Sequence, residues 1–231
     1  SFALSSASSE DVRVLCYRSM TCLARVGPLR KLMVKLGVVG IMKAFGESNN
    51  PEGSLICALT LCLFSFTREV RVEMMEQGAG RAALAVVKQA MESMGHGSAA
   101  DDGDRDGGSD NGSTQSNGEG LFMDIVCLTV ATLTNLALTP TTRTLIINDG
   151  VVPIILSLIE HDDEPVKRAC AATMRGLTLD DSTEIITEIV QQGGLEAILR
   201  LCNVTDMLIL RNCSAALCNI LAHESLLDDL F

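Results

Sequence analysis

The chain has 231 residues, of which only 3% are aromatic and none is Trp, and its formal net charge at pH 7 is −11. With so few bulky anchors, we expect thin helical layers filled by aliphatic residues, Met and Cys, and not one spherical core. The negative charge disfavours nucleic acid as a partner, because neutralising phosphates requires clustered Lys and Arg.

The nine cysteines fall almost entirely within apolar helical runs and include no CxxC pair. An odd number of cysteines without a signal peptide argues against a disulfide framework and against a zinc site. We interpret them as small buried side chains of a protein in a reducing compartment, cytoplasmic or possibly nuclear. We also expect no membrane insertion, because no apolar run of about 18 to 20 residues lacks a charged or polar interruption.

In chain order, residues 1–9 are expected to be a flexible lead. A helix from Glu10 to Val26 is predicted by its apolar spacing, and Gly27-Pro28 ends it. A short helix then runs from Leu29 to Leu36, so residues 10–36 form a partial repeat: a long helix followed by the next short one. Residues 37–77 form the next repeat, which begins with the block GVVGIMKAF.

The third unit, residues 78–149, is interrupted by a Gly/Ser/Asp-rich tract at residues 96–120. The tract has no apolar periodicity, and we predict a disordered acidic insert. Two interpretations stay open: a solvated spacer, or a regulatory segment phosphorylated at Ser109, Ser113 or Ser116. The fragment at residues 102–107 resembles half of an EF-hand loop, but position twelve is Ser113 and not the bidentate Glu that calcium requires.

The last two units, residues 150–192 and 193–231, state one pattern twice. The blocks GVVPIILSL and GGLEAILRL align with the earlier GVVGIMKAF, and each starts with a glycine that takes the backbone through a sharp bend. Successive block glycines are Gly37, Gly78, Gly150 and Gly193; the first and last pairs are 41 and 43 residues apart, and the longer middle interval contains the insert. Such a period predicts an all-α solenoid of about five repeats, incomplete at both ends, the last of them partial.

Near the end of each long helix the chain carries a version of Leu-x-Asn-Leu. It is intact at residues 133–136 (LTNL) and nearly so at 217–220 (LCNI). With three helices per unit and a glycine between the first two, the chain resembles the armadillo repeats of β-catenin and importin-α. The resemblance implies a right-handed superhelix whose third helices line a concave groove for extended peptides, with the signature Asn clamping the peptide backbone. The chain lacks the Trp that importin-α-like members use against Lys stems.

Counting back from the signature position along each long helix gives the residues expected to line the groove. The candidate partner-binding residues, predicted from this count and from neighbouring arginines, are Asn135, Asn219, Asn212, Arg168, Arg175, Arg211, Ser65 and Arg18. The arginines could pair with acids of a bound segment, or they could be ordinary solvated residues. The asparagines could bind a ligand, or they could bond neighbouring groups within the fold.

The sequence contains no pattern for a catalytic site, a nucleotide loop or a metal cluster. We therefore expect no enzyme, cofactor or metal. We predict an interaction scaffold that holds a protein segment, extended or helical, from another protein or from its own chain. Two alternatives stay open: a chaperone or assembly factor that resembles the armadillo-built myosin chaperones, and a structural module of a cytoskeletal or ciliary assembly.

Overall fold

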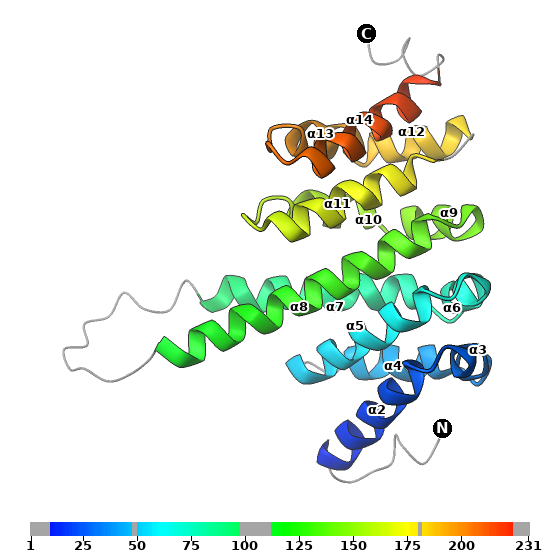
Figure 1. The fold of residues 1–231 in the computed structure, drawn as a ribbon, viewed down its shortest axis with the longest axis vertical. Coiled ribbons are helices and arrows are strands. Elements are labelled where there is room, and N and C mark those ends of the chain that lie inside the picture. Colours follow the sequence, from blue (N-terminus) through cyan, green and yellow to red (C-terminus); the bar gives the residue numbers. More distant parts are fainter. Residues whose placement is uncertain (1–9, 48–49, 98–111, 180–181, 224–231) are drawn as a thin grey trace, which may run out of the picture.

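The computed structural model describes residues 10–47, 50–97, 112–179 and 182–223, and within these ranges it contains helices and loops but no strand (Figure 1). The predicted lead at residues 1–9 and the last residues, 224–231, lie outside the described part. The helices are α2 (Glu10–Ala24), α3 (Gly27–Lys35), α4 (Val38–Gly46), α5 (Pro51–Ser65), η1 (Arg68–Val70), α6 (Arg71–Glu76), α7 (Ala79–Gly97), α8 (Gly112–Ala137), α9 (Pro140–Asn148), α10 (Val151–Leu158), α11 (Glu164–Leu177), α12 (Thr183–Gln191), α13 (Gly194–Leu201) and α14 (Met207–Leu221).

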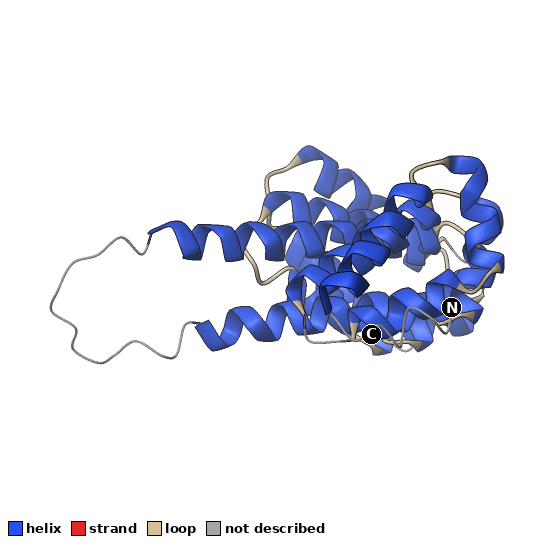
Figure 2. Ribbon diagram, turned by 90° about the horizontal axis from the view of Figure 1, so that it is seen from below, coloured by secondary structure: helices blue, strands red, loops and turns tan. Residues whose placement is uncertain are grey.

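The helices stack in three columns along one long axis. First helices α3, α6, α9 and α12 pack in order, as do second helices α4, α7, α10 and α13, and third helices α2, α5, α8, α11 and α14. Figure 1 shows the third helices crossing the front of the stack, and Figure 2 looks along the stack from below. The predicted all-α solenoid is confirmed.

Glycine places a sharp bend between the first and second helix of each repeat. Gly37, Gly78, Gly150 and Gly193 have φ angles of 77°, 88°, 88° and 92°. This left-handed conformation costs any residue with a Cβ about 1 to 2 kcal/mol. The second helix can therefore turn back against the first only where the sequence supplies glycine, as the repeated blocks predicted.

Three of the third helices begin at polar caps that follow the turn after a second helix. Asn50, Asp163 and Asp206 each accept hydrogen bonds from backbone N–H groups in the first turn of α5, α11 and α14. These caps satisfy donors that have no partner within the helix. The starts of these three helices are thereby fixed locally.

The core lies between the columns and contains aliphatic side chains, Met and small residues, with Phe64, Leu133, Ile155 and Leu177 among the fully buried ones. Burial raises the pKa of the Cys57 and Cys170 thiols to about 12, so they act as apolar packing groups. The prediction of buried cysteines does not hold for Cys22 and Cys218, which are exposed.

One prediction about α7 and α8 needs correction. The insert was predicted over residues 96–120, but α7 continues to Gly97 and α8 begins at Gly112, and the remaining residues lie outside the described part. In Figure 1 the two helices extend beyond the rest of the stack.

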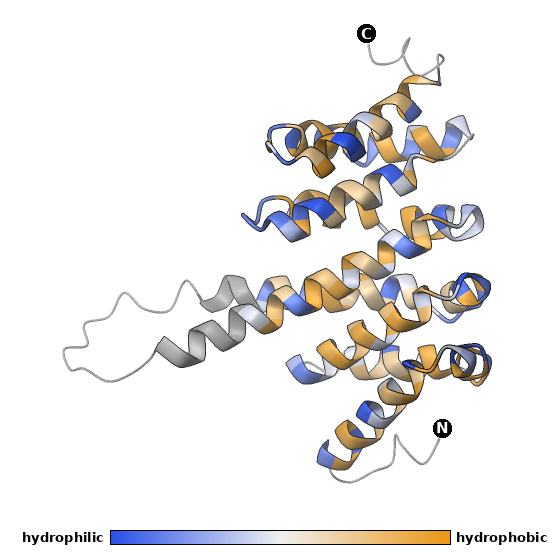
Figure 3. Ribbon diagram, viewed as in Figure 1, coloured by the Kyte–Doolittle hydropathy of each residue, from blue (hydrophilic) through white to orange (hydrophobic). Residues whose placement is uncertain are grey.

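The hydropathy of α8 bears on the predicted absence of membrane insertion. Residues Gly120–Ala137 of α8 are long and apolar enough to span a membrane by length and composition alone, and half of this stretch is buried in the fold. Helix α8 packs against α5, α7 and α11, so it needs apolar residues around most of its circumference. Figure 3 shows this stretch as mostly hydrophobic.

The bend glycines can be tested with a matched pair of substitutions. A Cβ on either Gly150 or Gly40 would meet no atom within 4 Å, but only Gly150 has a positive φ. We expect Gly150→Ala to lower the free energy of unfolding by about 1 kcal/mol, and Gly40→Ala, inside α4, to raise it by about 0.5 to 1 kcal/mol. Urea unfolding followed by circular dichroism measures both. Equal effects of the two variants would contradict the role of the bend.

Candidate protein-binding surface

Arginines, two of them buried and one partly buried, fasten the turn that follows each of three third helices. Arg30, Arg71 and Arg143 donate from Nε to the backbone oxygens of Ala24, Ser65 and Ala137, at 2.7, 2.8 and 2.9 Å. Each of these oxygens belongs to the last residue of a third helix. We call these three residues the clasp arginines.

Two clasp arginines also reach the next repeat. Arg71 Nη1 donates to Thr139 Oγ1 at 3.2 Å, and Arg143 Nη1 donates to the backbone oxygen of Leu179. Arg71 and Arg143 are 8% and 4% exposed, and desolvation lowers the pKa of Arg71, although a guanidinium stays protonated. The turns of neighbouring repeats are therefore joined by charge-assisted hydrogen bonds.

The sequence itself contains a recurring arginine that corresponds to the clasp. Arg30, Arg71 and Arg143 each stand seven residues before a bend glycine, whereas Ile186 occupies this position in the last repeat. An arginine that recurs at one position in three repeats indicates a shared structural role.

The two signature asparagines form hydrogen bonds within the fold. Asn135 Nδ2 donates to Ser65 Oγ at 3.0 Å, and Asn219 Nδ2 donates to Thr178 Oγ1 at 3.3 Å. Both bonds join neighbouring third helices, and both amides are partly buried. Ser65 is fully buried and donates in turn to the backbone oxygen of Cys62. Its predicted place on the groove surface is therefore wrong, since its hydroxyl cannot reach a partner.

Threonines make a second set of links between third helices. Thr21 and Thr60 are joined by a 2.7 Å hydrogen bond, as are Thr134 and Thr173. The two members of each pair are 39 residues apart, one on α2 or α8 and the other on the next third helix. Small polar side chains thus set the register of neighbouring third helices.

Two of the predicted arginines form ion pairs within the solenoid. Arg18 on α2 pairs with Glu52 on α5. Arg168 on α11 donates to Asp206, the N-cap of α14, at 2.7 and 2.9 Å, and to Glu164 at 2.7 Å. Both arginines are exposed, but they join third helices to one another.

The remaining candidates form a small polar patch on α11 and α14. Arg175 Nη1 lies 3.5 Å from Asn212 Oδ1, at the outer limit of a hydrogen bond, and both Arg175 and Arg211 are exposed. Neither arginine has an ion pair within the described ranges of the chain. This patch is the part of the predicted site that is free to contact a partner.

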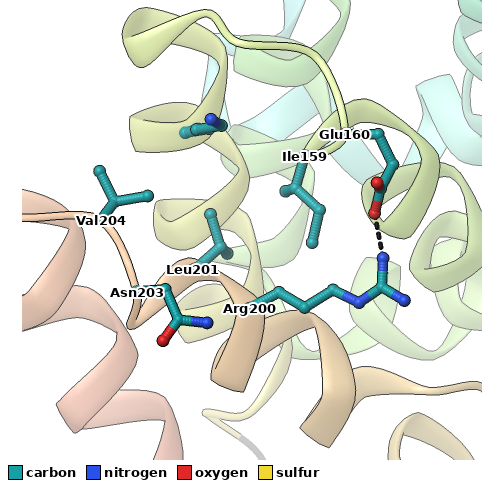
Figure 4. Close-up of a pocket in the computed structure, with 7 residues that line it drawn as sticks. Ile159, Glu160, Arg200, Leu201, Asn203 and Val204 are labelled. Carbon is teal, nitrogen blue, oxygen red and sulfur yellow. Dashed lines mark hydrogen bonds and ion pairs between the residues drawn. The ribbon is translucent and has the colours of Figure 1, made fainter.

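A hollow of about 440 Å³ lies between the α10–α11 and α13–α14 turns, at the opposite ends of the third helices from the clasp. Its lining includes Ile159, Leu201, Asn203 and Val204, and Figure 4 shows Arg200 crossing to Glu160. Its charged lining residue Lys167 pairs with Asp162 at 2.9 Å. Within the described residues no group of three His, Cys, Asp or Glu side chains could hold a metal ion.

The clasp can be tested by replacing one arginine. Arg143→Met removes both hydrogen bonds and leaves two carbonyl oxygens without their donor, so we expect the free energy of unfolding to fall by about 2 kcal/mol. Arg81→Met is the control, because Arg81 forms only an exposed pair with Asp149 at 3.8 Å, worth about 0 to 1 kcal/mol. Chemical denaturation of both variants gives the comparison, and a loss no larger than the control's would contradict the clasp.

The Arg168–Asp206 pair predicts acid sensitivity. The hydrogen bond from Arg168, and secondly that from the Ile209 N–H, lower the pKa of Asp206 to about 2. Because this pKa is below that of an unfolded Asp, about 3.9, the stabilising contribution is complete above pH 4 to 5 and is lost as the pH falls toward 2. Asp206→Asn keeps the N-cap and should flatten the decline of Tm between pH 5 and pH 2. Asp11→Asn, at an exposed position, is the control and should leave that slope unchanged.

Comparisons with known proteins agree with this geometry. Residues 140–179 and 182–222 match the armadillo/β-catenin-like repeat model. The crystal structure of an engineered protein superimposes with a TM-score of 0.70 and 19% identity, over 94% of this chain and 46% of that one. A computationally designed armadillo repeat protein for modular peptide recognition also has a TM-score of 0.70, with 14% identity over 94% of this chain and 79% of that one.

No curated protein matches the sequence. The chain spans less than half of the first engineered protein's length, and identities this low bear on the fold alone. The repeat matches, the bend glycines and the three stacked helix columns agree with one another. The chain therefore has an armadillo-like fold, an all-α solenoid in which residues 140–179 and 182–222 match armadillo repeats.

Proposed function

We propose that this protein is a non-enzymatic scaffold that binds a segment of a partner protein along its third helices. The observation that carries the proposal is the patch formed by Arg175, Arg211 and Asn212. Its two arginines are exposed on neighbouring third helices and Asn212 is half-buried beside them, whereas most of the chain's other groove candidates are bonded within the fold. Exposed guanidinium groups bind carboxylates well, because their N–H donors match the two oxygens.

The comparisons support a protein as the partner. Armadillo repeats present a column of parallel third helices, and one of the similar structures is a designed armadillo protein made for modular peptide recognition. Solenoids of this kind offer an extended surface and not a closed pocket. This favours a linear segment over a small molecule.

We further propose a cytoplasmic, or possibly nuclear, location and no role for nucleic acid or membrane insertion. The net charge of −11 opposes binding to phosphate backbones. The apolar part of α8 is half buried between neighbouring helices. Both features are consistent with a protein that acts by binding other proteins.

The proposal predicts a charge-dependent loss of partners. The double variant Arg175→Glu/Arg211→Glu should reduce the recovery of proteins that co-purify with the wild type by more than about tenfold, because like charges repel an acidic segment. The control is Lys35→Glu/Lys88→Glu, which makes the same charge change at exposed positions on a first and a second helix.

Quantitative mass spectrometry of tagged full-length chains measures both recoveries. Loss of the same proteins from the control variant would show that net charge, and not the patch, is responsible. Full retention by the Arg175→Glu/Arg211→Glu variant would overturn the proposal.

A further inference from the structure

Contacts between successive third helices show which of their positions are equivalent. Asn135 on α8 donates to Ser65 on α5, and Asn219 on α14 donates to Thr178, the residue after α11. The carbonyl group of Ser65 also accepts from a clasp arginine, as do those of the last residues of α2 and α8. Counting two residues back from each of these acceptors gives the reference position of each third helix: Cys22, Leu63, Asn135, Gly176 and, in α14, Asn219 itself.

Four positions of each third helix form a stripe that faces the third helix before it: the reference position and those three, seven and ten residues earlier. Thr60 and Thr173, three residues before the reference position, bond to threonines of the preceding helix at 2.7 Å. In α5, α8, α11 and α14 every residue at the four positions is buried or half-buried. Within the described residues α2 has a third helix on one side only, and all four positions are exposed there: Val12, Leu15, Ser19 and Cys22.

Two further residues at this end of the stack are exposed where their counterparts are not. Leu23 follows the reference position of α2 and is 50% exposed, whereas the residues after the other four reference positions are all buried. Leu36 precedes the bend glycine of its repeat and is 67% exposed. Two of its counterparts, Gln77 and Gln192, donate to backbone oxygens of the preceding first helix at 2.7 and 3.3 Å. Leu23, Leu36 and the four exposed residues of α2 form a surface that we call the N-terminal face.

The opposite end of the stack carries the other half of the same packing. Positions one and five residues before the reference position, and two after it, face the next third helix; Thr21 and Thr134 stand at the first of these and bond to the next helix. In α2 and α5 the residues at these three positions are buried, but in α14 all three are exposed. Figure 1 shows α2 and α14 at opposite ends of the stack. We call the three exposed residues the C-terminal face: Ser214, Cys218 and Leu221.

The two faces fit one another because they are the two sides of one repeated packing. If α14 of one copy lies against α2 of the next, the contact repeats those of α2 with α5, α5 with α8, α8 with α11 and α11 with α14. Ser19 then lies opposite Cys218 of the other copy, where the threonine pairs stand within the chain. Cys22 lies opposite Leu221, where Asn219 meets Thr178. Neither contact buries a charge, so burial of the apolar side chains favours association.

Charges at the two faces also match. Within the chain, an arginine of one third helix pairs with an acid at the start of the next: Arg168 with Asp206, and Arg18 with Glu52. Arg211 stands eight residues before its reference position, as Arg168 does, and is exposed. Asp11 is the counterpart of Glu52 in the first turn of α2 and is also exposed. End-to-end packing therefore brings Arg211 of one copy toward Asp11 of the next, which is an attractive arrangement.

We propose that copies of this chain associate head to tail, with the C-terminal face of one copy against the N-terminal face of the next. A contact between two different surfaces leaves one of each free, so it extends into linear assemblies and does not stop at a dimer. The inference goes beyond the scaffold function, because it assigns a second copy to two end surfaces that the scaffold function does not use. Since Arg211 also belongs to the groove patch, the tests leave it unchanged.

Disulfide crosslinking tests the register of the contact. Ser19→Cys/Cys22→Ser places a new thiol opposite the native Cys218 and removes the exposed thiol beside it. The hydroxyl oxygens of the corresponding threonine pairs are 2.7 Å apart, close enough for two thiols to be bridged. Mild oxidation should give more than about ten times the covalent oligomers of a control, because thiols held side by side react at a high effective concentration. The control is Ser157→Cys/Cys22→Ser, with the new thiol at an exposed position on α10.

Mass spectrometry of the crosslinked peptides identifies the bonded positions. We expect a bond between position 19 and Cys218, which must join two copies because α2 and α14 lie at opposite ends of the stack. Adding Cys218→Ser should abolish it. A yield no higher than the control's would contradict the proposal. So would a bond between position 19 of two copies, which would indicate a symmetric dimer through the N-terminal faces.

Light scattering measures association without a crosslink. The mass of the wild-type chain should rise with concentration above the 24.6 kDa of one copy, and Leu15→Ser/Leu23→Ser should keep it at that value. The control Leu145→Ser/Leu199→Ser removes side chains that are 41% and 53% exposed elsewhere, and it should associate as the wild type does. Circular dichroism checks that both variants fold. Should the first variant unfold, Asp11→Lys replaces it, because a lysine there repels Arg211 of the next copy.

A wild-type chain that stays at the mass of one copy up to about 1 mM would rule out head-to-tail association. This result would leave the scaffold function intact, since recovery of partner proteins through the groove patch is measured separately. Conversely, loss of the scaffold function would not affect the crosslink, which depends only on the two end faces.

Discussion

A buried guanidinium at the end of a third helix is the interaction on which the arrangement of the repeats depends. Arg71 and Arg143 each neutralise the carbonyl end of their own third helix and then bond to the turn of the next repeat. Burying a charge costs free energy unless every donor finds a strong acceptor. Here the acceptors are backbone oxygens left free at helix ends, which need donors themselves.

Hydrogen bonds and ion pairs between neighbouring third helices determine which groups remain available to a partner. Asn135, Asn219, Arg18 and Arg168 are bonded to groups on neighbouring third helices, so the polar side chains that would seem fit to bind a ligand hold the repeats together. Arg175 and Arg211 stay exposed on α11 and α14. The two signature amides therefore fix the register of neighbouring repeats, and few polar groups of the predicted groove remain for a partner.

The same packing accounts for the composition of α8. A third helix inside the solenoid contacts a third helix on each side and a second helix behind it, so little of its circumference faces water. Its apolar run, Gly120–Ala137, is therefore as long as a membrane span although half of it is buried against protein. Burial by neighbours from distant parts of the sequence accounts for the hydropathy of the buried half of this stretch.

The sequence by itself determined the features that depend on local chemistry. A positive φ requires glycine, so Gly37, Gly78, Gly150 and Gly193 marked the bends and the repeat period, and apolar spacing marked the helices between them. Only the tertiary structure decided the roles of Ser65, Asn135 and Arg143. Their partners lie 36 to 70 residues away along the chain, and whether a polar side chain faces a ligand or a neighbouring helix depends on how closely successive repeats pack.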